Sequence, residues 1–369
     1  MPERSATPAH HLTIRAISAV GVEVPMTFAL GTSRATITRA PLLLIDLDTE
    51  EGITGRAYLF CYLPAAAGAI ANMLDEVGRA TKGERVAPVD LWAALARRFA
   101  LIGVQGIVRM AMAGFDVACW DALAQAAKLP LARLLGAQAA RIPAYNSCGL
   151  GLMPARKLAD EAEKLLAGGL TAMKLRLGYA TLKEDIAALH AVRKRVPDGT
   201  LIMVDYNQAL TVAEALARGR ALDQEGVYWL EEPIRHDDLA GAARLARELA
   251  TPIQIGENFS EPHGMAAALA AGAADYVMPD LERIGGVTGW QRAAGLAAAH
   301  RIEMSSHLFP EVSAHLLAAT PTRHWLEWVD WANAIVEEPL RIADGFALVP
   351  ERPGNGLSWN KKAVEKYRM

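Results

Sequence analysis

The sequence lacks the features that define several common classes of protein. Its three cysteines, Cys61, Cys119 and Cys148, are too few and too scattered for a disulfide framework or a zinc cluster, so a reducing, cytoplasmic location is expected. Lys and Arg number 38 and Asp and Glu number 41, so no basic field indicates a nucleic-acid partner. The chain has no run of 18 apolar residues and no apolar signal-peptide core near its start, which predicts no membrane partner.

Motifs for nucleotide cofactors and for a serine nucleophile are also missing, because the sequence contains no GxGxxG, P-loop or GxSxG pattern. What the chain does contain is an apolar fraction of 52% over 369 residues, which suits a large folded core and excludes an intrinsically disordered protein. This length accommodates one barrel of about 250 residues with an attached unit.

The hydrophobic pattern changes once along the chain. Two strand-like runs and a helical stretch over residues 65–136 predict an α+β unit spanning residues 1–140. Over residues 141–339, eight short apolar runs alternate with Ala- and Leu-rich helical segments. Eight such runs joined by helices predict parallel strands that close into a barrel. Residues 340–369 are expected to fold back on the first unit.

Polar residues end the runs of the barrel region, and active sites in such barrels lie where the strands end at their C-terminal face. Three of these residues are carboxylates on consecutive runs: Asp205 in VDYN, Glu231 in WLEEP and Glu257 in GEN. Neighbouring strands lie about 4.8 Å apart, so three like charges would crowd together unless a cation neutralises them. Ligation by oxygen alone favours Mg²⁺ or Mn²⁺. Glu232 points to the other face by strand alternation and is expected to be a structural ion-pair partner.

The next two runs end in Asp280 and His307. A carboxylate beside an imidazole fixes its tautomer and leaves the other nitrogen as a base, so these two residues predict a catalytic dyad. On the other side of the carboxylates, Lys174 and Arg176 are two positions apart and share a face, where they could neutralise a substrate carboxylate. Glu327 ends the last run, and near an anionic substrate its pKa is expected to rise so that it donates a hydrogen bond as a neutral acid.

A divalent cation and two side-chain cations would hold a carboxylate while a base lies beside it. This arrangement suits removal of the proton α to that carboxylate. The carbon acid is very weak, so the enediolate must be stabilised electrostatically as it forms.

Several motifs also occur together in a characteristic order: VDYNQ, WLEEP, GEN, MPD with IGGVTGW, and SSHLF with SAHLLAATPT. Over nearly its whole length the chain resembles the mandelate racemase and muconate lactonizing enzyme group of the enolase superfamily. The resemblance implies an α/β fold in which an N-terminal α+β capping domain covers a modified (β/α)₇β TIM-like barrel. It also implies Mg²⁺, or Mn²⁺, as the cofactor, a small-molecule carboxylate as the substrate, and a homo-octamer.

The resemblance implies a role for each strand-end residue. Asp205, Glu231 and Glu257 would be the metal ligands, and His307, held by Asp280, would be a general base. The implied substrate contacts are Lys174 and Glu327 at the carboxylate, Asn207 near the α-oxygen, and Tyr58, Phe60 and Leu308 near the mouth. A cap loop at residues 31–39 would close the site. Its Arg34 and Arg39 would either serve a second anionic group or lie in a solvated loop.

Two positions depart from the family pattern. The family has Lys-x-Lys on the second strand, with the second Lys as the base on the opposite face, whereas this chain has Lys174-Leu175-Arg176. Neutral Arg at pH 7 costs roughly 7–8 kcal/mol, from about 5–6 pKa units at 1.36 kcal/mol each, so proton removal on that face should be slow. A one-base reaction through His307 is unaffected. Gly149 is interpreted as replacing a family serine on the first barrel strand, with loss of a hydroxyl near an enolate oxygen.

Three functions therefore remain open from the sequence. The first is racemisation or epimerisation of a 2-hydroxy acid, which the apolar residues near the mouth favour. The second is dehydration of an acid sugar with His307 as the single base, which Arg176 favours. The third is a catalytically silent homologue that only binds carboxylates.

Overall fold

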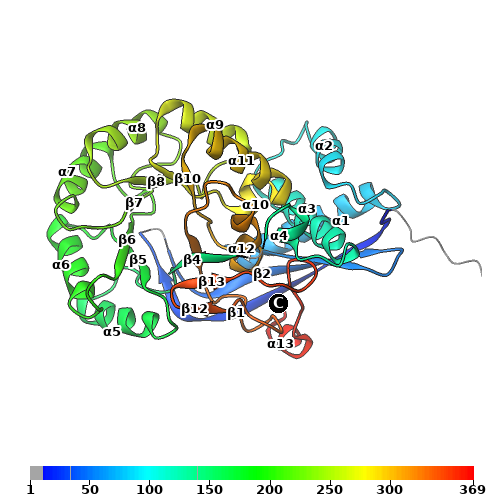
Figure 1. Cartoon of the computed structure of the whole chain (residues 1–369), viewed down its shortest axis with the longest axis horizontal. Coiled ribbons are helices and arrows are strands. Elements are labelled where there is room, and N and C mark those ends of the chain that lie inside the picture. The colour runs from blue at the N-terminus through cyan, green and yellow to red at the C-terminus, as the bar shows by residue number, and fades with distance from the viewer. Residues whose placement is uncertain (1–10, 34, 139) are drawn as a thin grey trace, which may run out of the picture.

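The computed structural model describes residues 11–33, 35–138 and 140–369, which form an N-terminal part and a barrel (Figure 1). The N-terminal part contains an antiparallel sheet in the order β1-β2-β3, followed by four helices. Its elements are β1 (Ile14–Gly31), β2 (Thr36–Thr49), β3 (Thr54–Phe60), α1 (Pro64–Thr81), α2 (Pro88–Arg98), α3 (Gly106–Ala126) and α4 (Leu131–Leu134).

Helix α3 packs closely on this sheet because small residues let the two elements approach. A Cβ atom added at Gly55 of β3 would lie 2.0 Å from the carbonyl oxygen of Ala118 on α3. A Cβ atom at Gly114 of α3 would lie 2.4 Å from the Cδ1 atom of Ile45 on β2. The fully buried helix and sheet surfaces form the core of the N-terminal part.

The barrel consists of parallel strands that pair in chain order, and helical crossover segments follow every strand except the last. Its strands are β4 (Arg141–Asn146), β5 (Ala172–Arg176), β6 (Leu201–Asp205), β7 (Leu230–Glu231), β8 (Ile253–Ile255), β9 (Tyr276–Val277), β10 (Glu303–Met304) and β11 (Leu326–Trp328). Its helices are α5 (Ala155–Leu166), α6 (Leu182–Arg193), α7 (Val212–Leu222), α8 (Leu239–Glu248), α9 (Glu261–Ala271), α10 (Leu281–Ile284), α11 (Gly286–His300) and α12 (Pro310–Ala318).

The barrel closes on both sides of β11. This strand pairs with β4 in parallel, with Glu327 opposite Tyr145. On its other side, backbone hydrogen bonds join Met304 of β10 to the segment before β11, including one of 2.9 Å from the amide of His324 to the carbonyl of Met304. All eight apolar runs predicted from the sequence contain a barrel strand.

Local sequence signals begin two of the barrel helices. Thr181 before α6 accepts a hydrogen bond from the amide of Glu184, and the Glu184 carboxylate in turn accepts one from the amide of Thr181. Thr211 and Glu214 form the same capping box at the start of α7. Reciprocal bonds of this kind satisfy amide groups that have no partner within the helix.

The last thirty residues contact both parts of the chain. The hairpin β12 (Ile342–Ala343) and β13 (Phe346–Leu348) pairs antiparallel with β4. Beyond it, the indole of Trp359 donates a hydrogen bond of 2.8 Å to Asp46 on β2, and α13 (Lys361–Tyr367) lies near β1. This segment therefore ties the barrel to the N-terminal sheet.

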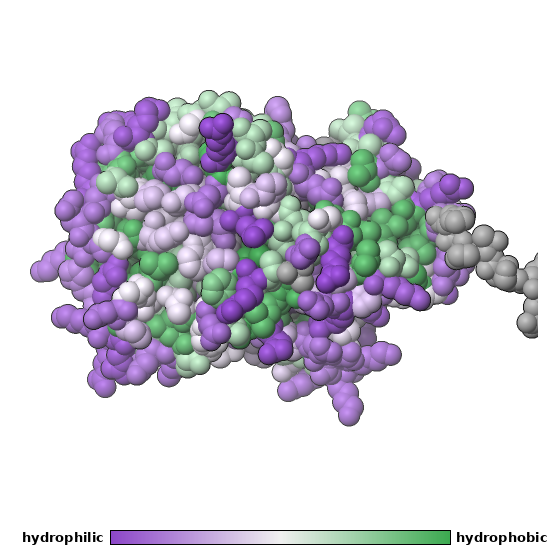
Figure 2. Space-filling model, viewed as in Figure 1, coloured by the Kyte–Doolittle hydropathy of each residue, from purple (hydrophilic) through white to green (hydrophobic). Residues whose placement is uncertain are grey.

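Polar and charged residues cover much of the face shown in Figure 2, with apolar residues in smaller areas between them. None of the helices in the described part of the chain has the length and apolar character needed to cross a membrane. The α/β fold predicted from the sequence, a capping domain over a TIM-like barrel, is confirmed.

Candidate active site

A cavity of about 210 Å³ lies where the N-terminal part meets the C-terminal ends of the barrel strands. Both parts of the chain supply its walls. The N-terminal part contributes Leu30, Thr32, Ala35, Ile37, Phe60 and Tyr62. The barrel contributes Lys174, Arg176, Asp205, Asn207, Gln208, Glu257, His307, Leu308, Glu327 and Trp331.

The three carboxylates expected to bind a metal lie together, with Asp205 and Glu257 in the wall of this cavity. Asp205, Glu231 and Glu257 each offer an oxygen atom, and these atoms all lie within 4.8 Å of one another. Burial and the Asp205, Glu327 and Glu257 carboxylates raise the pKa of Glu231 to about 8, although Lys174 opposes them. Burial and mutual repulsion thus disfavour the ionised form of this carboxyl group. A divalent cation with a preference for oxygen ligands, such as Mg²⁺, fits this set of donors.

Buried aromatic residues inside the barrel lie beneath the carboxylate trio and contact it at Glu231. The indole of Trp229 donates a hydrogen bond of 3.0 Å to Glu231, and the amide of Gln254 lies 3.4 Å from the same oxygen. Trp229 packs edge-on against Tyr145, and both are fully buried. These contacts fix the Glu231 carboxylate in one orientation.

Lys174 lies between the carboxylates rather than in open solvent. Its ammonium group is 2.6 Å from Glu231, 2.7 Å from Glu327 and 3.3 Å from Asp205, and its side chain is only 1% exposed. Burial alone would lower the pKa of Lys174, but Glu231 and Glu327 raise it well above its ordinary value. Lys174 is therefore a permanent cation at the wall of the cavity.

Glu327 is held in its ionised form. Its carboxylate accepts hydrogen bonds from the hydroxyl of Ser147 at 2.7 Å and from the amide of Leu308 at 2.8 Å. Burial alone would raise the pKa of Glu327, but Lys174 and His307 lower it below its ordinary value. The two neighbouring cationic groups thus favour the carboxylate, and the rise in the pKa of Glu327 expected beside an anionic substrate stays a prediction.

The predicted dyad is assembled at the same cavity. Asp280 Oδ2 lies 2.6 Å from His307 Nδ1, while Asp280 Oδ1 accepts hydrogen bonds from two amides at the start of α10. His307 Nε2 is 3.3 Å from Glu257 and 3.9 Å from Glu327. Burial alone would lower the pKa of His307, but Glu257, Glu327 and Asp280 raise it to about 9. A divalent cation bound by Glu257 would weaken this negative field and favour the neutral base.

Arg176 is held by the segment that follows the first barrel strand, β4. Its guanidinium group donates to the carbonyl of Gly149 at 2.8 Å and to the carbonyl and hydroxyl of Ser147, both at 3.1 Å. Arg176 is 4% exposed, lines the cavity, and has a buried Nε atom without a described partner. The side chain is thus a fixed cation facing the site.

The serine interpretation at Gly149 is corrected by these contacts. The chain does have a hydroxyl here, two residues earlier, at Ser147, where it bonds to Glu327 and Arg176. Gly149 instead has φ of +57°, and a Cβ atom there would lie 2.6 Å from Glu161. A side chain at position 149 would therefore be strained and crowded.

Glu232 is also placed differently from expectation. It is 1% exposed, and both of its oxygens accept hydrogen bonds from the amide of Asn258, at 3.0 and 2.9 Å. Its described partner is a neutral amide and not the cation expected for a structural ion pair. The turn that redirects this side chain has φ of +35° at Glu232 itself.

Of the expected substrate contacts, Asn207 and Leu308 line the cavity and Tyr58 does not. The Asn207 side chain donates to Asp205 at 3.0 Å. The hydroxyl of Tyr58 donates to Glu311 at 2.7 Å, and its ring packs on Phe309 with centroids 5.3 Å apart. Tyr58 therefore lies behind the wall, because it is two residues farther down β3 than the Phe60 side chain that reaches the cavity.

The predicted cap loop contributes three of the cavity residues, Thr32, Ala35 and Ile37, and Leu30 lies directly before it. Arg34 lies outside the described residues. Arg39 forms an ion pair of 3.1 Å with Glu23 on β1, and it donates to the carbonyl of the same residue. The structure thus gives Arg39 a partner within the sheet.

Several wall residues were not selected from the sequence. They are Tyr62, Gln208 and Trp331. Ser147, which bonds to the wall residue Glu327, was not selected either. Tyr62 has φ of +58°, and its ring lies under the guanidinium of Arg283 at 4.9 Å. The alternation Tyr58-Phe60-Tyr62 carries a signal for aromatic side chains on one face, but only the turn after β3 directs Tyr62 into the cavity.

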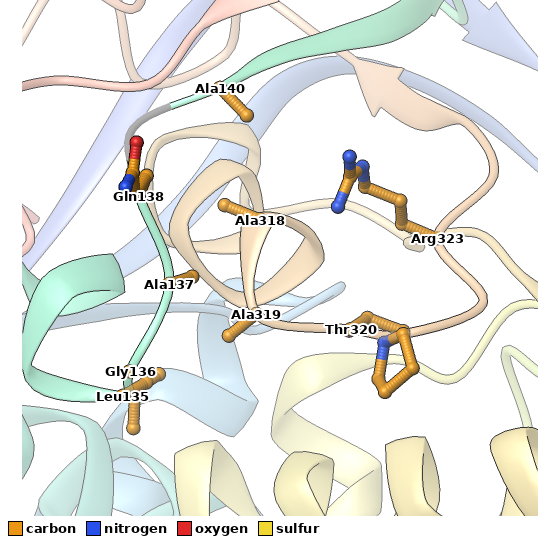
Figure 3. A pocket seen from close by; sticks show the side chains of 10 residues that line it. Leu135, Gly136, Ala137, Gln138, Ala140, Ala318, Ala319, Thr320 and Arg323 are labelled. Carbon is orange, nitrogen blue, oxygen red and sulfur yellow. The ribbon is translucent and has the colours of Figure 1, made fainter.

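A larger cavity of about 500 Å³ lies at the opposite end of the barrel, between the segments that precede β4 and β11 (Figure 3). Its described lining includes Gln138, Thr320 and Arg323 but no carboxylate, histidine or cysteine. Because acid–base and metal chemistry need such groups, the smaller cavity is the candidate active site.

Two family models match most of the chain. The model for the N-terminal domain of mandelate racemase and muconate lactonizing enzyme matches residues 15–136, and the enolase C-terminal domain-like model matches residues 157–363. Relatives of the chain include acid-sugar dehydratases, cycloisomerases and racemases. For example, it is 31% identical to L-talarate/galactarate dehydratase of Salmonella typhimurium over 89% of this chain and 82% of that protein.

Solved structures give the same assignment. An enolase from the alpha-proteobacterium BAL199 with bound magnesium is 43% identical, with a TM-score of 0.95 over 97% of this chain and all of that one. An enolase from Bradyrhizobium, complexed with magnesium and mandelic acid, is 41% identical, with a TM-score of 0.93 over 98% and 99% of the two chains. The fold, the carboxylate trio and these matches agree. The chain is a magnesium-dependent isomerase or hydro-lyase that belongs to the mandelate racemase and muconate lactonizing enzyme group of the enolase superfamily.

Proposed function

We propose that this enzyme removes the α-proton of a small 2-hydroxy carboxylate, in a racemisation or epimerisation, and that His307 is the base. The observation that carries the proposal is the Asp280–His307 pair beside the carboxylate trio. Asp280 occupies one ring nitrogen at 2.6 Å, so the other nitrogen is directed to the cavity. A base must lie within hydrogen-bond reach of the proton it removes, and a nitrogen that faces the cavity supports the assignment of that role to His307.

The other site residues have complementary roles in this proposal. Asp205, Glu231 and Glu257 would hold Mg²⁺, which when bound would stabilise negative charge on the substrate carboxylate. Lys174 supplies a second positive charge, and its ion pair with Glu327 fixes its position. Asn207, next to Asp205, is placed to contact the α-oxygen.

Apolar side chains in the wall support a substrate with an apolar substituent. Leu30, Ile37, Phe60, Leu308 and Trp331 all line the cavity. A cavity of about 210 Å³ is suited to a small acid. The Bradyrhizobium relative, which is 41% identical, was crystallised with mandelic acid, a ligand of this chemical class.

A second candidate, dehydration of an acid sugar, is favoured by Arg176. A fixed guanidinium cannot remove a proton near neutral pH, so a reaction that needs only one base is compatible with the site. In that case His307 would remove the α-proton and then assist departure of the β-hydroxide. The 31% identical Salmonella dehydratase shows that this activity occurs among the relatives.

The test is incubation of the Mg²⁺-loaded enzyme in D₂O with a panel that contains both enantiomers of mandelate and several sugar acids. Deuterium at Cα with loss of stereochemistry supports racemisation, and a 2-keto product supports dehydration. Absence of both, while Mg²⁺ is bound, supports the silent homologue. NMR and mass spectrometry measure the products.

The role of His307 is tested by the same exchange in a His307→Asn variant. We expect exchange from at least one enantiomer to fall by about three orders of magnitude or more, because general-base catalysis contributes roughly 10²–10⁴-fold. His263→Asn, which changes an exposed histidine on α9, is the matched control. Exchange that persists unchanged in His307→Asn would falsify the assignment of the base.

We also propose a homo-oligomer, an octamer by family resemblance, in a reducing cytoplasmic compartment. Exposed apolar side chains support intersubunit contacts, since Leu101 is fully exposed and Ile102 is 68% exposed. Three buried, unpaired cysteines support the compartment. Sedimentation velocity would give the mass, and a monomer at micromolar concentration would contradict the oligomer.

A further inference from the structure

We propose that Arg283, on the short helix α10, is a positioning residue that fixes the metal ligand Glu257 and the base His307 relative to each other. The inference rests on the proposed roles of those two residues. It adds a residue outside the cavity wall to the machinery of the site.

Arg283 makes direct contact with the segment that carries the third carboxylate. Its Nη1 atom donates to the carbonyl oxygen of Glu257 at 2.9 Å and to Oδ1 of Asn258 at 2.8 Å. The guanidinium therefore fixes both the backbone of Glu257 and the orientation of the next side chain.

Asn258 links Arg283 to the carboxylates of Glu257 and Glu232. With its oxygen bonded to Arg283, the amide nitrogen points the other way and donates to Glu257 Oε1 at 3.3 Å. The same nitrogen lies 3.0 and 2.9 Å from the two oxygens of Glu232. If the amide rotated, its oxygen would face two carboxylates, which is electrostatically unfavourable. Arg283 thus holds the rotamer that supplies a donor to the metal ligand.

The backbone of Arg283 contacts the dyad. Its amide donates to Asp280 Oδ1 at 3.0 Å, and Asp280 Oδ2 lies 2.6 Å from His307. His307 Nε2 in turn lies 3.3 Å from Glu257 Oε2. A closed ring of contacts therefore joins Arg283, Glu257, His307 and Asp280. Within this ring, Arg283 is the residue that has no proposed role in metal binding or proton transfer.

The guanidinium of Arg283 also contacts the capping domain. Its carbon lies 4.9 Å from the ring centroid of Tyr62, a wall residue of the cavity. A cation over an aromatic face is attracted by the ring quadrupole. One side chain thus links the capping domain, the proposed metal centre and the dyad.

Mn²⁺ binding tests the inference without a substrate, so its outcome is separate from the choice of substrate. We expect Arg283→Met to raise the Kd for Mn²⁺ by about tenfold or more, as outer contacts of metal ligands typically contribute 10–100-fold. The spectrum of the bound Mn²⁺ should also change, because Glu257 is reoriented. Electron paramagnetic resonance measures both quantities.

Two further variants separate positioning from simple loss of structure. Arg283→Lys keeps the charge, so we expect it to restore part of the Mn²⁺ affinity and to serve as the test if the Met variant does not fold. Asn258→Ala should weaken Mn²⁺ binding by a similar factor, and the double variant should show less than the product of the two effects.

Arg244→Met is the matched control, since Arg244 is exposed on α8 and pairs with Glu248 at 2.7 Å. We expect its Kd for Mn²⁺ and its spectrum to equal those of the unmodified enzyme. A folded Arg283→Met variant with unchanged Mn²⁺ affinity and spectrum would overturn the inference. If the effects of the Arg283 and Asn258 substitutions on Mn²⁺ affinity simply multiplied in the double variant, Arg283 would not act on Glu257 through the Asn258 amide.

Discussion

At the scale of single residues, the most consequential side chain is Arg176, which lines the cavity together with His307 and, by family resemblance, is expected to face the opposite side of the substrate. Both terminal nitrogens of its guanidinium donate hydrogen bonds, three in all, to Ser147 and Gly149. An arginine held in this way stays charged and cannot accept a proton. The enzyme should therefore exchange the two enantiomers of a substrate at very unequal rates.

We expect Arg176→Lys to raise exchange from the slower enantiomer by an order of magnitude or more. An amine near Lys174 can lose its proton far more readily than a guanidinium. Deuterium incorporation measured separately for each enantiomer gives the result. Arg244→Lys is the control on a distant helix, and equal rates in the Arg176→Lys variant and the unmodified enzyme would show that position 176 does not reach the substrate.

Sequence reasoning brought Asp205, Glu231, Glu257, Asp280 and His307 to one site because parallel strands present their C-terminal ends together. It was wrong where the chain leaves the regular strand geometry. Tyr58 was selected in place of Tyr62, and Gly149 in place of Ser147. In both cases the choice missed by two to four residues, and positive φ angles at Tyr62 and Gly149 redirect the chain there. A prediction based on the alternation of side chains along a regular strand does not account for such turns.

At the scale of elements, helix α3 connects the N-terminal sheet to the C-terminal segment. Asp121 on this helix accepts hydrogen bonds from the amide of Arg56 on β3 at 2.8 Å and from the amide of Asn355 at 2.6 Å. Its side chain is 1% exposed. One carboxyl group therefore satisfies buried donors from the sheet and from the C-terminal segment.

We expect Asp121→Ala to lower the free energy of unfolding by about 2–4 kcal/mol, because two buried amides would lose their acceptor at about 1–3 kcal/mol each. Denaturation in urea measures the change. Asp75→Ala, at an exposed position on α1, should change stability by less than about 0.5 kcal/mol. A small effect at Asp121 would mean that water replaces the carboxylate.

The order of the elements was predictable, but their lengths were not. Strands β7, β9 and β10 have two residues each, so their identity depends on pairing with neighbours more than on local pattern. The hairpin β12–β13 has no clear alternation and exists because β4 offers it an edge. Tertiary contacts of this kind are absent from a single sequence.

At the scale of the whole molecule, metal binding should stabilise the folded chain. A ligand that binds only the native state adds about 2.7 kcal/mol at 100 times its Kd. We expect Mg²⁺ to raise the melting temperature by several degrees and EDTA to reverse the change, as calorimetry would show. Glu257→Gln should abolish most of the response, whereas Glu365→Gln, at an exposed position on α13, should retain it. A magnesium-independent melting temperature would contradict a resident metal.

The division of the cavity between two parts of the chain has an evolutionary consequence. The groups that hold charge and move protons all follow residue 146, whereas much of the apolar wall is encoded before residue 63. Separate stretches of the gene therefore encode the residues that select the substrate and the residues that carry out the reaction. Recombination near the start of the coding sequence could retune which acid is admitted while the inherited reaction stays intact, and a chimera with a cap from a relative is a direct route to new specificities.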